Sequence, residues 1–426
     1  MVSCWGCRWY INGYIYVHEL MNKSDFPIFN NNPDLVYLDN SATTQKPQVV
    51  IDSIVDFYQN FNSNVHRGIH KLAEKATIEF ENARGNIARF VGAKPEEIIF
   101  TSGTTESMNI LAQILFEHFK DSKGKKTIML SEMEHHSNIL PWMMLVSKLG
   151  WDIEYAKLTE EYELDLECLY DVIKKNDVSI LSLTHMSNVL GTINNLGAIF
   201  SEVKSISPDI FCIGDGAQYV PHHKIDLSNS KSIDFYAFSG HKMMGPTGIG
   251  VLYGKKNLLE KLNPSKVGGG MISTVKRNSF TTAELPEKFE AGTPNIAGAI
   301  GLSKAVDYLK RQDTLEIEKH MSELTRFTLD ELRNIKELTL YGPPVFEKRG
   351  PVFSFSIEGI HPHDIAQILD QDNIAIRAGH HCCQILHRET LKIPASARAS
   401  LYIYNDIENV KRLSNSIKKL ITQFKR

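Results

Sequence analysis

The stretch FSGHKMMGPTGIGVLYG, residues 238–254, places a lysine in a glycine-rich loop directly after a predicted strand. The predicted strand is Asp234–Phe238, and the glycines on either side of Lys242 let the backbone approach a ligand closely. Such a lysine is either a solvated loop side chain or a Schiff-base amine, which must be desolvated or lie near other cations to be nucleophilic. Ser239 and His241 beside it are suited to bind a phosphate.

Around this loop, short β-branched runs alternate with helical patterns. The predicted strands are Ile98–Phe100, Thr127–Leu130, Val178–Leu183, Ile210–Ile213, Asp234–Phe238 and Gly250–Tyr253, and the intervening helices are Glu106–Phe119, Asn138–Leu149 and Leu196–Ile206. Strand, helix and strand at this spacing predict βαβ units and an α/β fold with a mainly parallel sheet covered on both faces. Polar residues recur just after the strand ends, where open α/β sheets place their ligands.

Three of these strand ends carry further candidate site residues. Asp215, in GDGAQ, is either a helix N-cap or an acid that holds the proton on the ring nitrogen of a pyridinium cofactor. The run Thr101–Glu106 is either a simple Ser/Thr cap or a phosphate cup made of N–H groups and hydroxyls, Thr104 and Thr105 among them. His135, in EHHSN, is either structural or stacked over an aromatic cofactor ring.

From about residue 300 the pattern changes to long helices and a few strands. Helices are predicted at Ala297–Lys310, Thr314–Ile335 and 406–424, and strands at Val352–Ile357 and Ile374–Arg377. We therefore predict an N-terminal appendage at 1–20, a large domain at 21–300 whose N-terminal segment packs on the small domain, and a smaller α+β domain at 301–426. The run of three glycines at 268–270 and the polar segment 273–288 predict an ordered or mobile excursion near the junction.

The composition is that of a soluble globular protein. The chain has 426 residues, of which 42% are hydrophobic and 23% charged. A length of this order predicts two domains, or one large α/β unit with an appendage. With a net charge of −3 we expect no nucleic-acid or membrane-surface partner. The sequence contains no run of about 18 apolar residues, so we predict no transmembrane helix.

Six cysteines, at positions 4, 7, 168, 212, 382 and 383, do not make a disulfide framework in a chain this long and indicate a reducing compartment. Cys4 and Cys7 read C-x-x-C, but no second pair completes a zinc site, and we expect no metal. The first 20 residues lack the apolar core of a signal peptide and are poor in Arg and Ser for a transit peptide. They fit a remnant of a targeting sequence or an upstream start before Met21.

Taken together, the motifs resemble one family. The chain from about Phe26 to its end is similar to the group II, or SufS-type, cysteine desulfurases, which belong to the pyridoxal-phosphate-dependent, class-V aminotransferase-like enzymes. The resemblance is carried by YLDNSATTQKP (37–47), NVHRGIHKLA (64–73), TSGTTESMN (101–109), MEHHSNILPW (133–142), SNVLGT (187–192), DGAQ (215–218), FSGHKMMGPTGIGVLYG (238–254), FEAGTPN (289–295) and RAGHHCCQ (377–384). RAGHHC and GTTE distinguish this subgroup from the group I relatives.

The resemblance implies fold type I, a homodimer with active sites at the subunit interface, and a role for each matching residue. Lys242 would bind pyridoxal 5′-phosphate covalently, His135 would stack on its ring, and Asp215 would contact the ring nitrogen. The remaining cofactor contacts would be Gln218 at the phenolic oxygen, Thr104, Thr105, Ser239 and His241 at the phosphate, and Thr293 at the phosphate of the neighbouring subunit. Asn188 and Arg398, with Arg377 close by, would hold the substrate carboxylate.

In the implied reaction, Arg398 fixes L-cysteine by its carboxylate, Lys242 moves the α-proton, and the Cys382 thiolate attacks the substrate sulfur. The products are alanine and a persulfide on Cys382. His380, His381 or the cofactor itself would help to form the thiolate. Cys383 departs from the family pattern and is either an inert buried thiol or a secondary sulfur acceptor, and the stretch 385–397 looks inserted.

Two alternatives to this function remain open in the sequence. A selenocysteine lyase or cysteine-sulfinate desulfinase would use the same cofactor residues. The other alternative is a catalytically silent scaffold for iron–sulfur assembly, and the presence of Lys242 and Cys382 argues against it. The resemblance also implies a sulfur acceptor of the SufE or SufU kind and an onward path to iron–sulfur clusters. A composition rich in Lys and Asn, with the short appendage, favours a plastid-type organelle such as an apicoplast or chloroplast, and a bacterial-type cytoplasm is the alternative.

Overall fold

The computed structural model describes residues 9–11, 14–16, 23–124, 126–312 and 314–424. Cys4 and Cys7, and with them the question of a zinc site, lie outside the described residues. Of the predicted appendage, two short strands are described, β1 (Trp9–Ile11) and β2 (Tyr14–Tyr16). Within this part of the chain, no helix combines the length with the apolarity that crossing a bilayer requires. Nor do three or more His, Cys, Asp or Glu side chains gather there in a way that could hold a metal ion.

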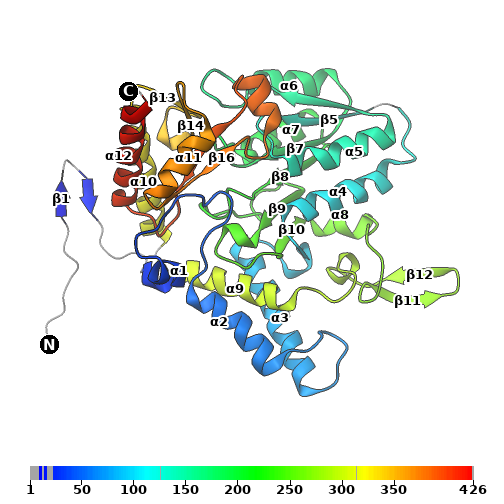
Figure 1. Cartoon of the computed structure of the whole chain (residues 1–426). Helices are drawn as coiled ribbons and strands as arrows, with labels where there is room; N and C mark the ends of the chain where they lie inside the picture. The colour runs from blue at the N-terminus through cyan, green and yellow to red at the C-terminus, as the bar shows by residue number, and fades with distance from the viewer. Residues whose placement is uncertain (1–8, 12–13, 17–22, 125, 313, 425–426) are drawn as a thin grey trace.

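A seven-stranded sheet forms the centre of the molecule (Figure 1). Its strands, in spatial order, are β4 (Ile98–Thr101), β10 (Gly250–Gly254), β9 (Phe235–Ser239), β8 (Phe211–Asp215), β7 (Val178–Thr184), β5 (Thr127–Ser131) and β6 (Asp152–Ala156). Strand β10 runs antiparallel to both of its neighbours, and the other pairs are parallel. The predicted α/β class with a mainly parallel mixed sheet is therefore confirmed.

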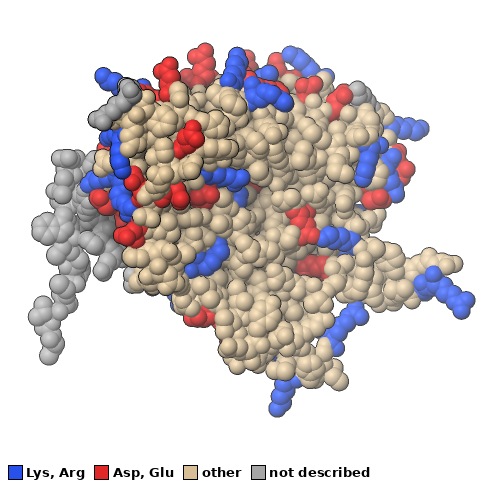
Figure 2. All heavy atoms as spheres, in the orientation of Figure 1, with Lys and Arg blue, Asp and Glu red and all other residues tan. Residues whose placement is uncertain are grey.

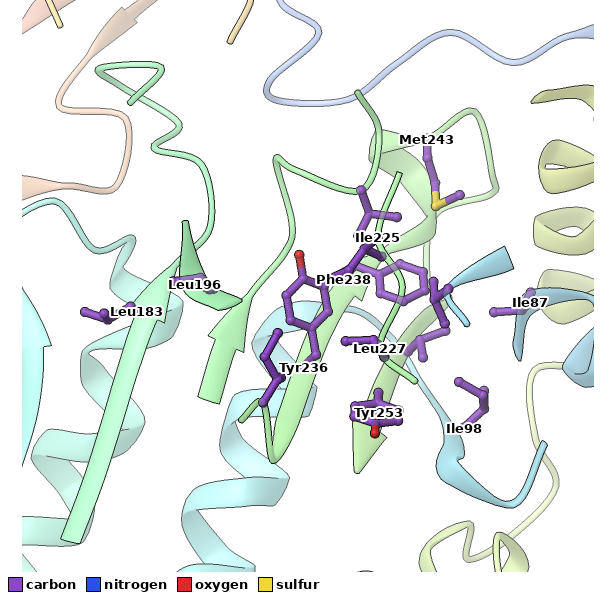
Figure 3. Close-up of a cluster of buried hydrophobic side chains, with 14 of the residues drawn as sticks. Ile87, Ile98, Leu183, Leu196, Ile225, Leu227, Tyr236, Phe238, Met243 and Tyr253 are labelled. Atoms are coloured by element: carbon purple, nitrogen blue, oxygen red, sulfur yellow. The ribbon is translucent and has the colours of Figure 1, made fainter. Parts of the chain in front are cut away.

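Helices cover both faces of this sheet because successive strand residues alternate between two apolar clusters. On β9, Phe235 and Ala237 join the cluster formed with α4 (Thr104–Phe119), α5 (Leu140–Leu149) and α8 (Lys256–Lys261). Tyr236 and Phe238 join the opposite cluster, together with Ile225 and Leu227 (Figure 3). The helices of that face are α3 (Lys71–Phe90), α6 (Leu166–Lys175), α7 (Leu196–Ile206) and α9 (Ile296–Arg311).

The C-terminal part forms a smaller α+β unit, as predicted. Its antiparallel sheet has the order β13 (Leu338–Tyr341), β14 (Val352–Ile357), β17 (Ser396–Ser400), β16 (Arg377–Gly379). The helices that pack with it are α10 (Thr314–Arg333), α11 (Pro362–Gln371) and α12 (Ile407–Phe424). Buried apolar residues of both sheet and helices form a separate core.

The N-terminal segment crosses the molecule to this C-terminal unit. Strand β3 (Val36–Tyr37) pairs in parallel with β15 (Ile374–Ala375). Just before it, Phe26 at the start of α1 (Pro27–Asn31) packs its ring edge-on against Tyr404 at 4.9 Å. The segment then leads through α2 (Gln48–Asp56), which lies against α9. The division of the chain at residue 300 stays a prediction, since α9 runs across that position.

The glycine-rich excursion is an ordered hairpin. Strands β11 (Ile272–Lys276) and β12 (Ser279–Thr282) pair with each other and project from the body of the molecule (Figure 1). Val275 and Phe280 on the hairpin are 67% and 49% exposed. Figure 2 shows Lys or Arg side chains at its tip, charges of both signs over the upper part of the visible face, and few charged side chains over the lower part.

Candidate active site

A cavity of about 190 Å³ opens at the carboxyl end of the parallel strands. It lies where the two sheets and the N-terminal segment meet. The predicted site residues that line it are Thr104, Thr105, His135, Asn188, Asp215, Gln218, Ser239, His241, Lys242, Arg377 and Arg398. Cys382 and Thr293 are the two predicted site residues that do not line it. The sequence thus placed eleven of its candidates around one cavity.

The N-terminus of α4 forms one end of the cavity. Ser239 Oγ accepts the Thr104 N–H at 2.9 Å and lies 2.9 Å from the Thr104 hydroxyl, while Thr105 Oγ1 lies 2.7 Å from Ser137 Oγ. The helix is preceded by Gly103 at a φ of 151°, where an added Cβ would stand 3.2 Å from Ser239 Oγ. Hydroxyls and backbone N–H groups at the start of a 16-residue helix favour an anion such as a phosphate.

Lys242 follows β9 in the short 3₁₀ turn Gly240–Lys242. Burial lowers the pKa of its amine to about 8, the charge of Asp215 opposes this shift, and the charge of Arg398 adds to it. A lysine amine is a nucleophile only when it is neutral, so this environment activates it near physiological pH.

The turn that carries Lys242 is held by the N-terminal segment. The His241 carbonyl oxygen accepts the Thr44 N–H at 3.0 Å, the Thr43 hydroxyl at 3.0 Å and the Lys46 ammonium at 3.0 Å. Burial lowers the pKa of His241 to about 4, so its ring is neutral at physiological pH. The position of Lys242 therefore depends on chain segments about 200 residues apart.

Asp215 ends β8 and is 3% exposed. Its Oδ1 accepts the Ala217 N–H at 2.9 Å. Burial raises the pKa of this carboxyl group, and the hydrogen bond and the charge of Lys242 act against the rise. Glycine is required at Gly216 next to it, since an added Cβ would lie 2.2 Å from the Tyr236 ring. A buried acid of this kind can hold a proton on a ring nitrogen.

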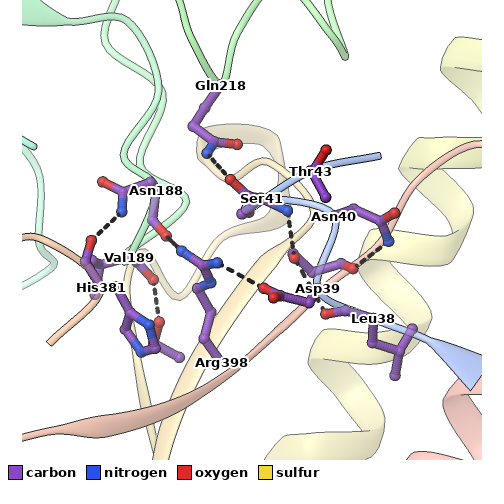
Figure 4. A network of polar contacts seen from close by, with 12 residues as sticks. Leu38, Asp39, Asn40, Ser41, Thr43, Asn188, Val189, Gln218, His381 and Arg398 are labelled. Atoms are coloured by element: carbon purple, nitrogen blue, oxygen red, sulfur yellow. Dashed lines mark hydrogen bonds and ion pairs between the residues drawn. The ribbon is translucent and has the colours of Figure 1, made fainter. Parts of the chain in front are cut away.

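His135 and Gln218 face the same space. His135 Nδ1 accepts the Ser137 N–H at 3.1 Å, which leaves the proton of the neutral ring on Nε2. Burial, with the charge of Lys242 as the next cause, lowers the pKa of His135 to about 3. Gln218 donates from Nε2 to the Ser41 carbonyl at 2.7 Å (Figure 4). A flat neutral imidazole is suited to stack on an aromatic ring.

Arg398 and Arg377 give the cavity a second anion-binding region. Arg398 on β17 is 1% exposed, and it donates to the Asn188 carbonyl at 3.0 Å and to the Asp39 carboxylate at 2.9 Å (Figure 4). Arg377 on β16 is its direct cross-strand partner. Two guanidinium groups side by side are suited to a carboxylate.

The loop after β16 places Cys382 one residue beyond the cavity wall. His381 lines the cavity, and both His381 and Cys382 have positive φ values, 51° and 58°. The backbone is fixed there: the Cys382 carbonyl accepts the His136 N–H at 2.7 Å, and the Cys382 N–H reaches His380 Nδ1 at 3.2 Å. The Cys382 thiol is free and partly exposed. Non-glycine residues in this region of φ are strained, which is common at functional loops.

Cys383 is buried, and its thiol donates to Asn188 Oδ1 at 3.1 Å. Burial raises the pKa of this thiol far above its usual range. The Asn188 amide donates in turn to the His381 carbonyl at 2.8 Å. Nucleophilic attack requires a thiolate. These contacts therefore favour an inert buried thiol over a secondary sulfur acceptor as the role of Cys383.

Thr293 is exposed and precedes α9, outside the cavity. Its predicted partner is the cofactor of a second subunit, so a position outside its own cavity is compatible with that role. The role stays a prediction.

Within the described part of the chain, three buried polar atoms in the cavity wall have no hydrogen-bond partner. They are Ser41 Oγ, His381 Nδ1 and Arg398 Nε. Buried polar atoms are rarely left unpaired, so the wall is built for a polar ligand. With a phosphate region at one end, an activated amine and a buried acid in the middle, and two guanidinium groups opposite, the residues present fit pyridoxal 5′-phosphate together with an amino acid.

Sequence reasoning missed three residues that support or line the site. Asp39, which pairs with Arg398, and Ser41 both lie in the quoted YLDNSATTQKP stretch, and Ser137 follows the quoted histidine pair. The motif itself was a signal for all three, but no local pattern indicates which distant side chains they meet.

Comparison with known proteins agrees with this geometry. The family model described as aminotransferase class-V matches residues 36–413. A probable cysteine desulfurase of Halalkalibacterium halodurans is 46% identical over 407 residues, which cover 94% of this chain and 97% of that protein.

Solved structures give the same result. A cysteine desulfurase of Thermococcus onnurineus, in its apo form, superimposes with a TM-score of 0.89 at 37% identity and covers 94% of this chain and 97% of that one. The Escherichia coli cysteine desulfurase CsdA, in an S-sulfonic acid form, superimposes with a TM-score of 0.85 at 35% identity, with coverage of 94% and 98%.

Proposed function

Since the chain belongs to the class-V aminotransferase family and is a pyridoxal-phosphate-dependent cysteine desulfurase of fold type I, we propose that it is of the SufS type and carries the sulfur as a persulfide on Cys382. The observation that carries the proposal is the juxtaposition of Lys242, Asp215 and Arg398 in one cavity with Cys382 on the adjoining loop.

Bound in this cavity, pyridoxal 5′-phosphate supplies an aldehyde carbon that amines attack and a ring that accepts electrons from the substrate. Lys242 would hold the aldehyde carbon covalently, and Asp215 would hold the proton on the ring nitrogen. His135 would lie over the ring, and Gln218 would donate to its phenolic oxygen. The residues at the start of α4, with Ser239 and His241, would bind the phosphate.

Arg398 positions the substrate. Its Nε is buried without a partner among the described residues, and its two other nitrogens are held by Asn188 and Asp39, so the guanidinium is fixed before a ligand arrives. A carboxylate that meets Nε, with Arg377 beside it, would orient L-cysteine for reaction. A group fixed in advance loses little entropy on binding.

Lys242 and Cys382 carry the proton and the sulfur. The neutral Lys242 amine would take the α-proton of the bound amino acid. The Cys382 thiolate would then attack the substrate sulfur: an S–S bond forms, the C–S bond breaks with its electron pair staying on carbon, and protonation of that carbon gives alanine. L-cysteine and the Cys382 thiol are thereby converted into L-alanine and a Cys382 persulfide, with atoms and electrons balanced.

A homodimer is supported by the distribution of exposed apolar side chains. Nine of the sixteen large exposed apolar residues among those described lie on α2, α3, the turns between and beside them, and the β11–β12 region. They are Ile51, Val55, Tyr58, Ile69, Leu72, Ile78, Val267, Val275 and Phe280. In Figure 1, α2 and α3 lie at the bottom of the molecule, and the β11–β12 hairpin projects at the lower right. A patch of this kind on one side indicates a protein partner, and a second copy would also bring Thr293 to the neighbouring cofactor.

The persulfide requires a sulfur acceptor, and we propose a protein of the SufE or SufU kind that leads to iron–sulfur cluster assembly. The partly exposed position of Cys382, next to an outer groove, supports transfer to another protein. The compartment remains the one predicted from the sequence, a plastid-type organelle or a bacterial-type cytoplasm.

The experiment is persulfide mapping by mass spectrometry after L-cysteine and pyridoxal 5′-phosphate are added, with alanine measured in parallel. The Cys382→Ala variant should bind the cofactor with its yellow colour and make no alanine from cysteine. Cys383→Ala is the matched control, and it should keep both the persulfide on Cys382 and alanine production. Unchanged alanine production by Cys382→Ala would refute the assignment, and a colourless wild-type protein would favour the silent scaffold.

A further inference from the structure

A chain of hydrogen bonds leads away from the cavity through two imidazole rings and one hydroxyl. His381 Nε2 lies 3.1 Å from the Ser396 hydroxyl and 3.1 Å from the Ser396 carbonyl oxygen, and His387 Nε2 lies 3.1 Å from the same hydroxyl. Beyond it, His387 Nδ1 lies 3.0 Å from the Cys383 carbonyl oxygen. His381, Ser396 and His387 are 2%, 0% and 1% exposed.

The two carbonyl contacts fix the direction of these bonds. A carbonyl oxygen only accepts, so the neutral His387 ring carries its proton on Nδ1, toward Cys383, and its Nε2 is an acceptor. The Ser396 hydroxyl therefore donates to His387. By the same reasoning His381 carries its proton on Nε2, toward Ser396. The His381 Nδ1 atom is then an unprotonated acceptor.

The ends of the chain open into two different spaces. His381 lines the cavity, and its Nδ1 is buried there without a partner. His387 lines a separate outer groove of about 490 Å³. The other residues of this groove are His380, Gln384, Arg388, Lys392, Ile393 and Pro394. The hydrogen-bonded chain is thus a path between an enclosed site and an open one.

The surroundings keep both rings neutral. Burial lowers the pKa of His381 well below its ordinary value, with the charges of Arg398, His387 and Arg377 acting in the same direction and the Ser396 carbonyl acting against it. Burial also lowers the pKa of His387, with the Cys383 carbonyl opposing and His380 adding to the shift. Rings that are neutral at rest can each take up a proton and pass on another.

We propose, on the basis of the function proposed above, that His381, Ser396 and His387 relay a proton from the amino acid bound in the cavity to solvent in the outer groove. The N–H or S–H bond of L-cysteine breaks and an N–H bond forms at His381 Nδ1. The Nε2 proton of His381 passes to the Ser396 oxygen, and the Ser396 hydroxyl proton passes to His387 Nε2. The Nδ1–H bond of His387 then breaks, and this proton leaves the Cys383 carbonyl oxygen for water in the groove. One proton enters the chain and one leaves it, and no electron is transferred between molecules.

The reaction needs such an outlet for protons. Free L-cysteine has an ammonium group at neutral pH, and its nitrogen must lose a proton before it can bond to carbon, as its thiol must if the sulfur leaves as a persulfide anion. Of the other two imidazoles that line the cavity, His241 is assigned above to the phosphate, and His135 already accepts the Ser137 N–H with its Nδ1. In this scheme His381 touches the substrate, whereas Ser396 and His387 act through it as positioning residues.

The test uses His387→Gln, which keeps a donor toward Cys383 and an acceptor toward Ser396 but cannot pass a proton, and Ser396→Ala, which removes the middle of the chain. Arg388→Gln, exposed on the same π-helical turn (Leu386–Thr390), is the matched control.

Stopped-flow absorbance of the holoenzyme is recorded after mixing with L-cysteine or L-alanine, in H₂O and D₂O. Both variants should slow the reaction on the order of 100-fold, the lower range for general acid–base groups, with a larger solvent isotope effect. The control should react like the wild type.

The amino acids distinguish the source of the proton. If the variants react slowly with both L-cysteine and L-alanine, the relay carries the ammonium proton. If they react slowly with L-cysteine alone, it carries the thiol proton. If His387→Gln reacts with both amino acids at the wild-type rate, the proposal is overturned. Added imidazole, which fits the outer groove, should restore part of the rate to a His387→Ala variant.

A second measurement separates this proposal from the desulfurase mechanism. Nitrogen-15 NMR of histidine-labelled protein should place the proton of His381 on Nε2 and that of His387 on Nδ1. The opposite tautomers would overturn the relay even in a fully active enzyme. If these tautomers and the slowed variants are found but no persulfide appears on Cys382, the proposed function fails and the relay stands.

Discussion

At the scale of single residues, the reactivity of the site depends on side chains whose pKa values are shifted by burial. The Lys242 amine has a pKa of about 8 because it is desolvated, and Asp215 limits the shift. The neutral amine is the reactive form, so uptake of pyridoxal phosphate by cofactor-free protein should accelerate as pH rises to about 8 and level off above it. Replacing Asp215 with Asn removes the charge that raises the amine pKa, and the profile should move to lower pH. The rate of uptake is measured by absorbance after mixing. A shift of the Asp215→Asn profile to higher pH would contradict this explanation.

Arg398 gives a second prediction at this scale. An Arg398→Lys variant keeps the charge but loses the planar donor set that holds Asn188 and Asp39 and leaves Nε for the ligand. Loss of one hydrogen bond to a charged group costs about 1.5–3 kcal/mol, so kcat/KM for L-cysteine should fall about 10- to 150-fold. The control is Arg412→Lys, at the contact with Asp34 and Asp372, which should leave kcat/KM unchanged. An equal fall in both variants would show a general loss of structure.

At the scale of elements, the turn after β8 determines where Asp215 points. In Gly216→Ala the new methyl group would overlap the buried Tyr236 ring, and overpacking of this kind costs about 1–3 kcal/mol. We expect lower stability in urea unfolding and weaker cofactor binding. Gly197→Ala, near the start of α7, is the control, because its Cβ would meet only Asn195 Oδ1 at an ordinary 3.6 Å and should not lower the stability. Equal stability of Gly216→Ala and the wild type would mean that the turn adapts.

The strands also show which parts of the fold could be predicted from the sequence. Strands such as β7, buried along all seven residues, were predictable because their short segments are rich in apolar and β-branched residues (VSILSLT). Strand β17 was missed because its sequence, SARAS, has no apolar run, although every residue of it is buried. Ala397 and Ala399 pack in the core of the C-terminal unit, while Arg398 between them lines the cavity, so the composition of β17 reflects both the core and the site. Strand β6 was missed because it is an edge strand with exposed polar residues.

The same limits apply to the site. Thr105, His135, Asp215 and Lys242 could be predicted because parallel strands bring their carboxyl ends to one edge of a sheet. The partners Asp39 and Arg398 are 359 residues apart, and no local pattern encodes such a pairing. The roles carried over by resemblance, above all those of Cys382 and Thr293, stay predictions until they are measured.

At the scale of the whole molecule, the apolar patch on α2, α3 and the hairpin predicts a dimer. The double variant Ile69→Asp, Phe280→Asp places charges on two of its exposed residues and should raise the dimer dissociation constant about 30-fold or more, as loss of an interface hot spot of about 2 kcal/mol does. Sedimentation velocity measures it. Val345→Asp, on an exposed apolar residue elsewhere, is the control. A wild-type protein that sediments as a monomer would contradict the prediction.

The pairing of β3 with β15 also has a consequence for synthesis on the ribosome. Asp39 emerges early, but the strand that carries Arg398 follows 359 residues later, which is roughly 20 to 70 seconds at ordinary rates of elongation. During that time the seven-stranded sheet can assemble and Thr44 can meet His241, while Asp39 and β3 still lack Arg398 and β15. The nascent enzyme therefore completes its active site as one of the last steps of its synthesis.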